Sequence, residues 1–208
     1  MRLPSRKASP YTSQMPTIRS LCVYCASSSR GPESHKAAAQ QLGRLLAENG
    51  IRLIFGGGRV GLMGVVADAA LAGGGEVVGV IPGFLRDLEL AHDGCDEMIV
   101  TDSMHSRKQK MAELSDGFAI LPGGLGTLDE AFEIITWRQL RLHDKPIVIV
   151  NIEDYWRPLE RLIQQITGSG YMRAADAPLF RVVDRVEDIL PALREAPAAR
   201  QPLETKWI

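Results

Sequence analysis

The stretch FAILPGGLGTLDE, from Phe118 to Glu130, decides the fold. Its first four residues form a short apolar run between glycine and proline, which is typical of a strand buried on both faces. A glycine-rich turn follows, and apolar residues then recur at helical spacing at Leu128, Ala131, Phe132 and Ile135. The stretch therefore predicts a strand, a tight turn and a helix, the repeating unit of a parallel α/β sheet.

The same unit recurs along the chain. Seven short apolar runs are the expected strands: Ile18–Tyr24, Ile51–Phe55, Glu76–Ile81, Met98–Thr101, Phe118–Leu121, Ile147–Val150 and Leu179–Val183. Six helical patterns alternate with them: His35–Glu48, Leu62–Ala72, Met104–Leu114, Leu128–Leu142, Tyr155–Thr167 and Val186–Leu193. The alternation predicts one α/β domain over residues 18–194, a doubly wound parallel sheet with helices on both faces.

Such sheets bind their ligands at the carboxyl ends of the strands. Five segments follow predicted strands and hold most of the unusual residues: Cys25–Arg30, Gly56–Gly64, Pro82–Glu89, Asp102–Lys108 and Pro122–Glu130. Outside the domain, residues 1–17 are basic, contain no acid and lack an apolar core, which is unlike a secretory signal peptide. We expect a disordered tail there, with an organelle transit peptide as the alternative and Met15 as an alternative start to Met1. Residues 195–208 are expected to form a C-terminal tail.

The composition is that of an ordinary globular protein that works in the cytoplasm. Of the 208 residues, 45% are hydrophobic and 24% charged, and the net charge is -1. The charges form no block of one sign and no apolar run approaches the ~20 residues of a membrane span, so neither a nucleic-acid nor a membrane partner is expected. Cys22 and Cys25 have redox spacing, but they lie along a predicted strand and not at a helix N-terminus. We expect reduced thiols and no metal site, since zinc needs about four ligands.

Two glycine-rich segments follow strands. GGGRVG, Gly56–Gly61, matches the dinucleotide pattern GxGxxG, but it occupies the second turn and the acid Glu76 begins the next strand instead of ending it. A tight turn is the preferred interpretation, and phosphate contact is the alternative. In PGGLGT, glycines at 123, 124 and 126 expose backbone N–H groups at a helix start, which suits a phosphomonoester.

Four polar residues are candidates for the site, and three of them have two interpretations each. Thr127 is an expected N-cap, and Glu130 three residues later completes a capping box or serves as a catalytic carboxylate. Arg107 and Lys108 fall in the first turn of a helix that Ser103 would cap, where cations oppose the helix dipole. They either bind an anion or belong to a solvated helix face.

Five stretches, in order, resemble the LOG ("lonely guy") family of cytokinin riboside 5′-monophosphate phosphoribohydrolases: VYCASSS (Val23–Ser29), FGGGRVGLMG (Phe55–Gly64), MHSRK (Met104–Lys108), PGGLGTLDE (Pro122–Glu130) and ITWRQLRLHDKPIVIVN (Ile135–Asn151). The resemblance covers about residues 20 to 193. It implies a Rossmann-like fold, usually a homodimer, and hydrolysis of the N-glycosidic bond of prenylated adenosine 5′-monophosphate without a cofactor. The products would be the cytokinin base and ribose 5-phosphate.

The resemblance also implies residue roles. Arg107 and Glu130 would be the catalytic pair, and the substrate would be bound by Glu89, Lys108, Gly123, Gly124, Leu125, Gly126, Thr127, Leu128, Asp129 and Thr136. Cleavage builds positive charge on the ribose, which a carboxylate stabilises while it positions or deprotonates water. We therefore expect Glu130 to act on the ribose. A guanidinium does not give up its proton, so Arg107 is expected to orient the substrate and support the departing base electrostatically.

Two other functions remain open at this point. One is a general nucleosidase that cleaves plain AMP, because prenyl selectivity needs an apolar pocket that loop motifs do not report. The other is a nucleotide- or cofactor-binding carrier on the same scaffold, such as the molybdenum-cofactor carriers, which would bind tightly and release no base. A dehydrogenase is the weakest contender.

Overall fold

The computed structural model describes residues 17–89, 91–173 and 179–195. Seven parallel strands form one sheet in the order β4-β3-β2-β1-β5-β6-β7. Their bounds are β1 Ser20–Tyr24, β2 Arg52–Phe55, β3 Val77–Pro82, β4 Glu97–Thr101, β5 Gly117–Ile120, β6 Ile147–Val150 and β7 Arg181–Val183. All seven expected strands are present, and the prediction of a doubly wound parallel sheet is confirmed.

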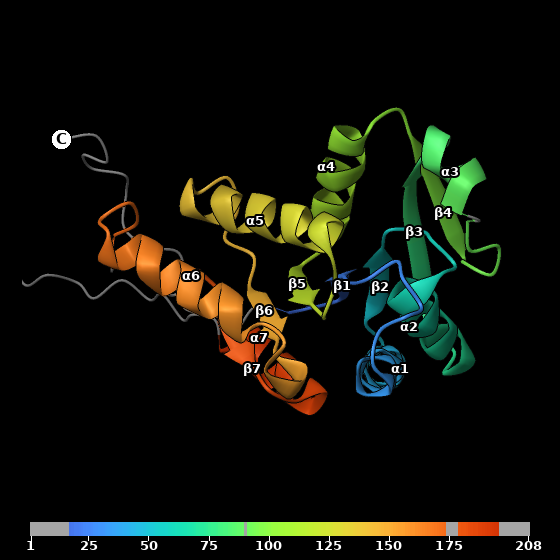
Figure 1. Cartoon of the computed structure of the whole chain (residues 1–208). Helices are drawn as coiled ribbons and strands as arrows, with labels where there is room; N and C mark the ends of the chain where they lie inside the picture. The colour runs from blue at the N-terminus through green and yellow to red at the C-terminus, as the bar shows by residue number, and fades with distance from the viewer. Residues whose placement is uncertain (1–16, 90, 174–178, 196–208) are drawn as a thin grey trace, which may run out of the picture.

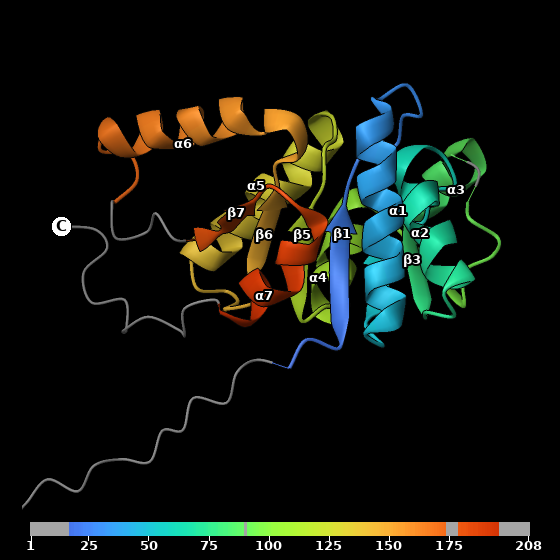
Figure 2. The ribbon, with the colours of Figure 1, turned by 90° about the horizontal axis from the view of Figure 1, so that it is seen from below.

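The helices cover both faces of the sheet. They are α1 Glu33–Glu48, α2 Gly61–Ala72, α3 Gly83–Glu89, α4 Met104–Leu114, α5 Leu125–Gln139, α6 Arg157–Gly168 and α7 Ile189–Arg194, with short 3-10 turns at Ile152–Asp154 and Val186–Asp188. Figure 1 shows α4 and α5 on one face and α1 and α2 on the other, and Figure 2 gives the view from below. Each face has its own hydrophobic core: α1, α2 and α7 pack on one, and α4, α5 and α6 on the other. No helix among the described residues is long and apolar enough to cross a membrane.

Two predicted boundaries were wrong. The segment Pro82–Glu89 was expected as a loop, but Gly83–Glu89 forms α3. Its apolar side chains Phe84 and Leu88 are 56% and 77% exposed, so these two positions form no buried stripe that a periodic pattern could reveal. The helix expected over Leu128–Leu142 begins and ends three residues earlier. The tails expected at 1–17 and 195–208 lie, apart from Thr17 and Glu195, outside the described residues.

The segment Gly56–Gly61 forms the tight turn that was the preferred interpretation. Gly61 has a φ of 72°, a left-handed conformation that favours glycine, and a Cβ there would lie 2.4 Å from the carbonyl carbon of Ser27. The loop after β1 and the start of α2 are thus in direct contact, and the Leu62 N–H donates to the Ala26 carbonyl at 2.8 Å. This contact leaves no room for a ligand between the two segments at Gly61.

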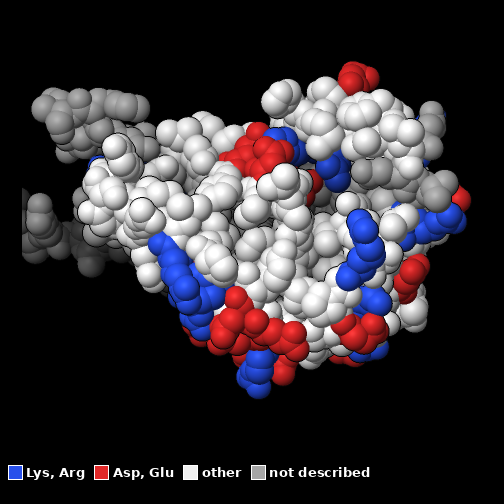
Figure 3. All heavy atoms as spheres, viewed as in Figure 1, with Lys and Arg blue, Asp and Glu red and all other residues white. Residues whose placement is uncertain are grey.

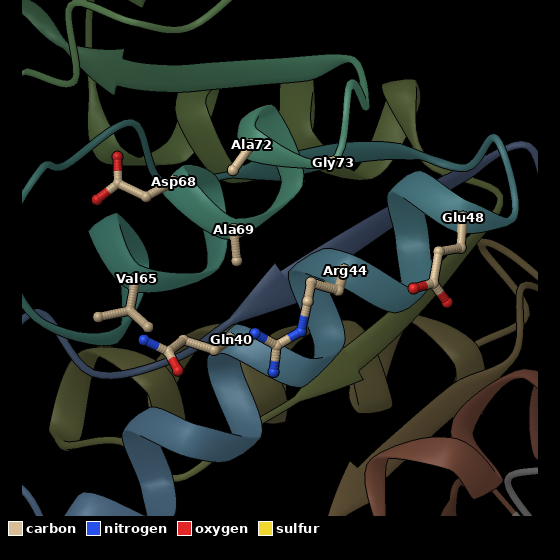
Figure 4. A pocket seen from close by; sticks show the side chains of 8 residues that line it. All are labelled: Gln40, Arg44, Glu48, Val65, Asp68, Ala69, Ala72 and Gly73. Atoms are coloured by element: carbon tan, nitrogen blue, oxygen red, sulfur yellow. The ribbon is translucent and has the colours of Figure 1, made fainter.

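A groove of about 460 Å³ opens between α1 and α2 (Figure 4). The residues that line it run from the middle of each helix to its carboxyl-terminal end or follow α2 directly: Gln40, Arg44, Glu48, Val65, Asp68, Ala69, Ala72 and Gly73. Because these helices run antiparallel to the strands, the groove extends toward the amino edge of the sheet. The loops that follow the strands lie at the opposite edge.

Candidate active site

The strand order reverses between β1 and β5. The chain leaves β1 for α1 on one face of the sheet and leaves β5 for α5 on the other face. In doubly wound folds, the place where two connections diverge in this way, at the carboxyl ends of the strands, is the usual ligand site. The Ala26 N–H donates to the Pro122 carbonyl at 3.1 Å and joins the loops after β1 and β5 at this edge of the sheet.

The glycine loop forms the amino end of α5 without any side-chain cap. Gly124, in extended backbone (φ -92°, ψ -155°), is the N-cap, and the helix begins at Leu125. Nothing would touch a Cβ placed at Gly124 or Gly126, and Leu125 is 85% exposed, so this end of the helix faces open space. Its first N–H groups are available to an anion, as the sequence predicts.

The expected N-cap at Thr127 and its capping box with Glu130 are wrong. Thr127 is the third residue of α5 and is buried, and a Cβ at Gly123 would lie 2.1 Å from its Oγ1. Because Gly124 already turns the chain, the helix starts three residues earlier than a threonine cap would allow. Glu130 is then the sixth helical residue, beyond reach of the cap position. Its carboxylate is left for another partner.

That partner is Arg107. Its Nη1 donates to Glu130 Oε1 at 3.1 Å, and the two side chains are 8% and 10% exposed. The other guanidinium nitrogens bind backbone carbonyls: Nε donates to Val80 at 3.0 Å and Nη2 to Gly56 at 3.3 Å. Arg107 therefore joins α4, β3 and the loop after β2 to the carboxylate on α5.

Burial brings the pKa of Glu130 close to physiological pH. Burial raises the pKa of Glu130 from 4.5 to about 7, although the Arg107 charge opposes the shift, and the charges of Asp129 and Glu133 add to it while Lys108 lowers it. A carboxyl group with a pKa near 7 can exchange a proton at physiological pH. Perturbed groups of this kind gather at functional sites.

Lys108 forms a second charged cluster beside the first. Its Nζ lies 3.0 Å from Asp129 Oδ2 and 3.1 Å from Glu133 Oε1. Burial lowers the pKa of Lys108, but the hydrogen bonds and charges of these two carboxylates outweigh burial and the pKa is raised. In Figure 3 acidic and basic side chains lie next to one another in the upper middle of the face, near α4 and α5.

Helix α4 presents both cations to the site. Ser103 caps it, as expected, in a reciprocal capping box with Ser106. Arg107 and Lys108 follow as the fourth and fifth helical residues, each only 6% exposed, so the interpretation as a solvated helix face is wrong. Carboxylates of the same chain balance both charges: Glu130 pairs with Arg107, and Asp129 and Glu133 pair with Lys108.

Two predicted substrate residues lie apart from this cluster or cannot be placed. Thr136 follows Gly124 by twelve residues and is exposed; at about 1.5 Å per helical residue it lies roughly 18 Å along α5. Glu89 is the last residue of α3, and its side chain lies outside the described residues. The remaining predicted residues, Gly123 to Asp129 with Arg107, Lys108 and Glu130, come together.

Sequence reasoning missed two contacts. Gly56 gives its carbonyl to Arg107, and Tyr155 donates its hydroxyl to the Gly123 carbonyl at 2.7 Å. The glycine at position 56 indicates that another group approaches the backbone closely, but the sequence does not identify that group as Arg107. Tyr155 carries no signal in the sequence, because the helical pattern places it at the start of the expected helix Tyr155–Thr167.

The thiols take no part in the cluster. Cys22 on β1 packs in the core under α4 and α5, and Cys25, which follows the strand directly, packs in the opposite core. Burial raises the pKa of both thiols. In the described part of the chain, no group of three or more His, Cys, Asp or Glu side chains could hold a metal ion.

Comparison with known proteins places the chain in a family. A family model described as "Possible lysine decarboxylase" matches residues 63–193. A cytokinin riboside 5′-monophosphate phosphoribohydrolase from Rhodococcoides fascians is 43% identical over 180 residues, which cover 86% of this chain and 91% of the relative. One from Arabidopsis thaliana is 38% identical over 198 residues, 92% of each chain. The chain belongs to the LOG family.

The solved structures agree with the LOG family fold. The molybdenum cofactor carrier protein of Chlamydomonas reinhardtii superposes with a TM-score of 0.66 over 86% of this chain and 98% of its own, at 23% identity. That likeness concerns the fold alone. The decarboxylase description of the family model finds no support at Lys108, since a Schiff-base lysine needs a lowered pKa and this amine is held by two carboxylates.

Proposed function

We propose that the protein is an N-glycosyl hydrolase that cleaves prenylated adenosine 5′-monophosphate into the cytokinin base and ribose 5-phosphate. The observation that carries the proposal is the buried Arg107–Glu130 pair, less than two helical turns from the open amino end of α5 at the reversal of strand order. The names of the LOG relatives support the same reaction.

The chemistry follows from the charges. The 5′-phosphate binds the amide groups at Gly124–Thr127, which leaves the ribose beside Glu130. As the bond to the base breaks, its electron pair leaves with the base and positive charge grows on the sugar. Glu130 stabilises that charge and takes a proton from the water that attacks C1′, for which a pKa near 7 is suited. Arg107 orients the nucleotide and supports the departing base, and Lys108 with Asp129 borders the site.

Base release measured by chromatography tests this function. Prenylated AMP, plain AMP and the prenylated riboside are compared, and only the prenylated monophosphate is expected to release its base. Equal cleavage of plain AMP identifies a general AMP nucleosidase instead. Tight nucleotide binding with no base released from any of the three identifies a carrier.

We further propose that the protein works as a homodimer whose sites use Thr136 of the second copy. Within one chain Thr136 lies roughly 18 Å along α5 from Gly124, too far to share a nucleotide with the glycine loop. Its exposure leaves it available to another molecule. A cytoplasmic location fits the three free cysteines.

Mixed dimers test the Thr136 proposal. Glu130→Gln and Thr136→Ala chains, each impaired alone, are expected to regain activity when mixed, because one of the two sites then has both native residues. The molar mass in solution is measured in parallel. A monomer, or a mixture as inactive as its components, contradicts the shared site.

A further inference from the structure

Tyr155 contacts the glycine loop from a different part of the chain. Its hydroxyl donates to the Gly123 carbonyl at 2.7 Å, across 32 residues of sequence. Gly123 immediately precedes the N-cap Gly124, so its carbonyl belongs to the peptide that carries the Gly124 N–H. A hydrogen bond to this carbonyl fixes the plane of that peptide, and with it the direction of the N–H.

The Gly123 backbone is held by a second contact. A Cβ there would lie 2.1 Å from Thr127 Oγ1, so the bare glycine lies directly against the buried threonine of the first helical turn. Thr127 and Tyr155 together leave the loop little freedom. Amide groups that are aligned before an anion arrives bind it without a further ordering cost.

The ring of Tyr155 is itself fixed in place. It meets His35 edge to face, with centroids 5.2 Å apart and planes at 83°, and Trp156 at 4.9 Å and 83°. His35 belongs to α1, and burial lowers its pKa although the Glu153 charge opposes the shift. Three connections of the sheet, after β1, β5 and β6, therefore converge on one phenol ring.

The turn that delivers Tyr155 is strained. Glu153 and Asp154 have φ values of 51° and 61°, a left-handed conformation that residues with a side chain seldom adopt. The buried Asn151 holds this turn: its Nδ2 donates to Asp154 Oδ1 at 3.2 Å and its Oδ1 accepts from the Trp156 N–H at 2.8 Å. Strain of this kind persists where the surrounding structure enforces it, and it gathers at functional positions.

We propose that Tyr155 is a positioning residue of the nucleotide site, which aligns the glycine-loop amides for the 5′-phosphate through its hydrogen bond to Gly123. The proposal rests on the proposed function for the identity of the ligand. Tyr155 is 42% exposed, so the residue is not part of the buried hydrophobic core. Its effect belongs to substrate binding, with little effect on the bond-breaking step at Glu130.

The test removes only the hydroxyl. Tyr155→Phe keeps the ring contacts with His35 and Trp156, and Tyr171→Phe is the matched control because Tyr171 is 86% exposed. For Tyr155→Phe we expect the KM for prenylated AMP and the Kd for plain AMP, measured by calorimetry, to rise about three- to tenfold, the range of one neutral hydrogen bond. The kcat and the melting temperature stay close to those of the wild type, and Tyr171→Phe changes none of the four.

The remaining outcomes overturn one proposal or both. An unchanged KM and Kd in Tyr155→Phe, with or without a lower melting temperature, reduces Tyr155 to a structural residue. If the wild type releases no base but binds AMP, the hydrolase proposal fails, and the AMP Kd of the two proteins still decides the role of Tyr155. If the wild type neither binds AMP nor releases base from prenylated AMP, the glycine loop is not a nucleotide site and both proposals fail.

Discussion

The guanidinium of Arg107 lies 3.1 Å from the carboxylate of Glu130, and both side chains are about nine-tenths shielded from solvent. Neither group is free to turn toward water, because Arg107 also donates to the carbonyls of Val80 and Gly56. The carboxylate is therefore held in one place before any substrate binds. Such preorganisation is what electrostatic catalysis requires.

Glu130→Gln is expected to lower kcat roughly 100- to 10,000-fold, the usual contribution of a positioned general base. The amide oxygen can still accept from Arg107, so the fold and the melting temperature stay nearly intact. The control is Glu133→Gln, which removes a neighbouring carboxylate that contacts Lys108. Steady-state base release and thermal melting measure both variants, and an active Glu130→Gln would remove Glu130 from the mechanism.

The activity is expected to rise with pH through a value near 7. The deprotonated form of Glu130 is the base, and its pKa is raised to about 7 by burial. The profile of kcat/KM reports the free enzyme, so it should be low at pH 5.5 and level above pH 8. Because the Glu133 charge helps to raise this pKa, Glu133→Gln is expected to move the midpoint to lower pH. A flat profile between these limits contradicts the assignment.

The same pKa makes a prediction for stability, with the opposite sign. The folded pKa of Glu130 lies above its ordinary value of 4.5, so between pH 4.5 and 7 the folded chain binds more protons than the unfolded chain. The contribution of Glu130 to stability is therefore present at low pH and is lost as the pH rises through this window, by at most roughly 3 kcal/mol.

At pH 5 and at pH 8, urea unfolding gives the difference in the free energy of unfolding between the wild type and Glu130→Gln. The change in that difference between the two pH values measures the loss. The exposed Glu113 on α4 provides the control Glu113→Gln. The wild type is expected to lose stability relative to Glu130→Gln between the two pH values, and not relative to Glu113→Gln. A constant difference from Glu130→Gln means that Glu130 titrates alike in both states.

The fold could be predicted from the sequence because buried strands and helices leave periodic signals. α3 left none, since Phe84 and Leu88 point their apolar surface outward. The charged loops could be located, but not the pairings within them: Arg107 meets Glu130 across 23 residues, and no local pattern gives that distance. Thr127 was misassigned for a similar reason. Gly124 caps the helix without a side-chain hydrogen bond, and N-cap propensity alone does not separate glycine from threonine.

Gly56→Ala is expected to impair catalysis from outside the glycine loop. An added Cβ would lie 2.0 Å from Arg107 Nη2 and 2.9 Å from the sulfur of Met63. The buried guanidinium must then move, and a displacement of about 1 Å in a catalytic group can lower the rate roughly 100-fold. Overpacking should also lower the free energy of unfolding by about 1–3 kcal/mol.

Gly168→Ala separates the two effects of Gly56→Ala. Gly168 ends α6, and nothing lies within 4 Å of a Cβ placed there. This control should keep full activity and gain up to about 1 kcal/mol, because alanine orders a helix at a lower entropic cost than glycine. If Gly56→Ala loses stability but keeps its kcat when assayed well below its melting temperature, the position of Arg107 does not limit the reaction, and the pair must act through Glu130 alone.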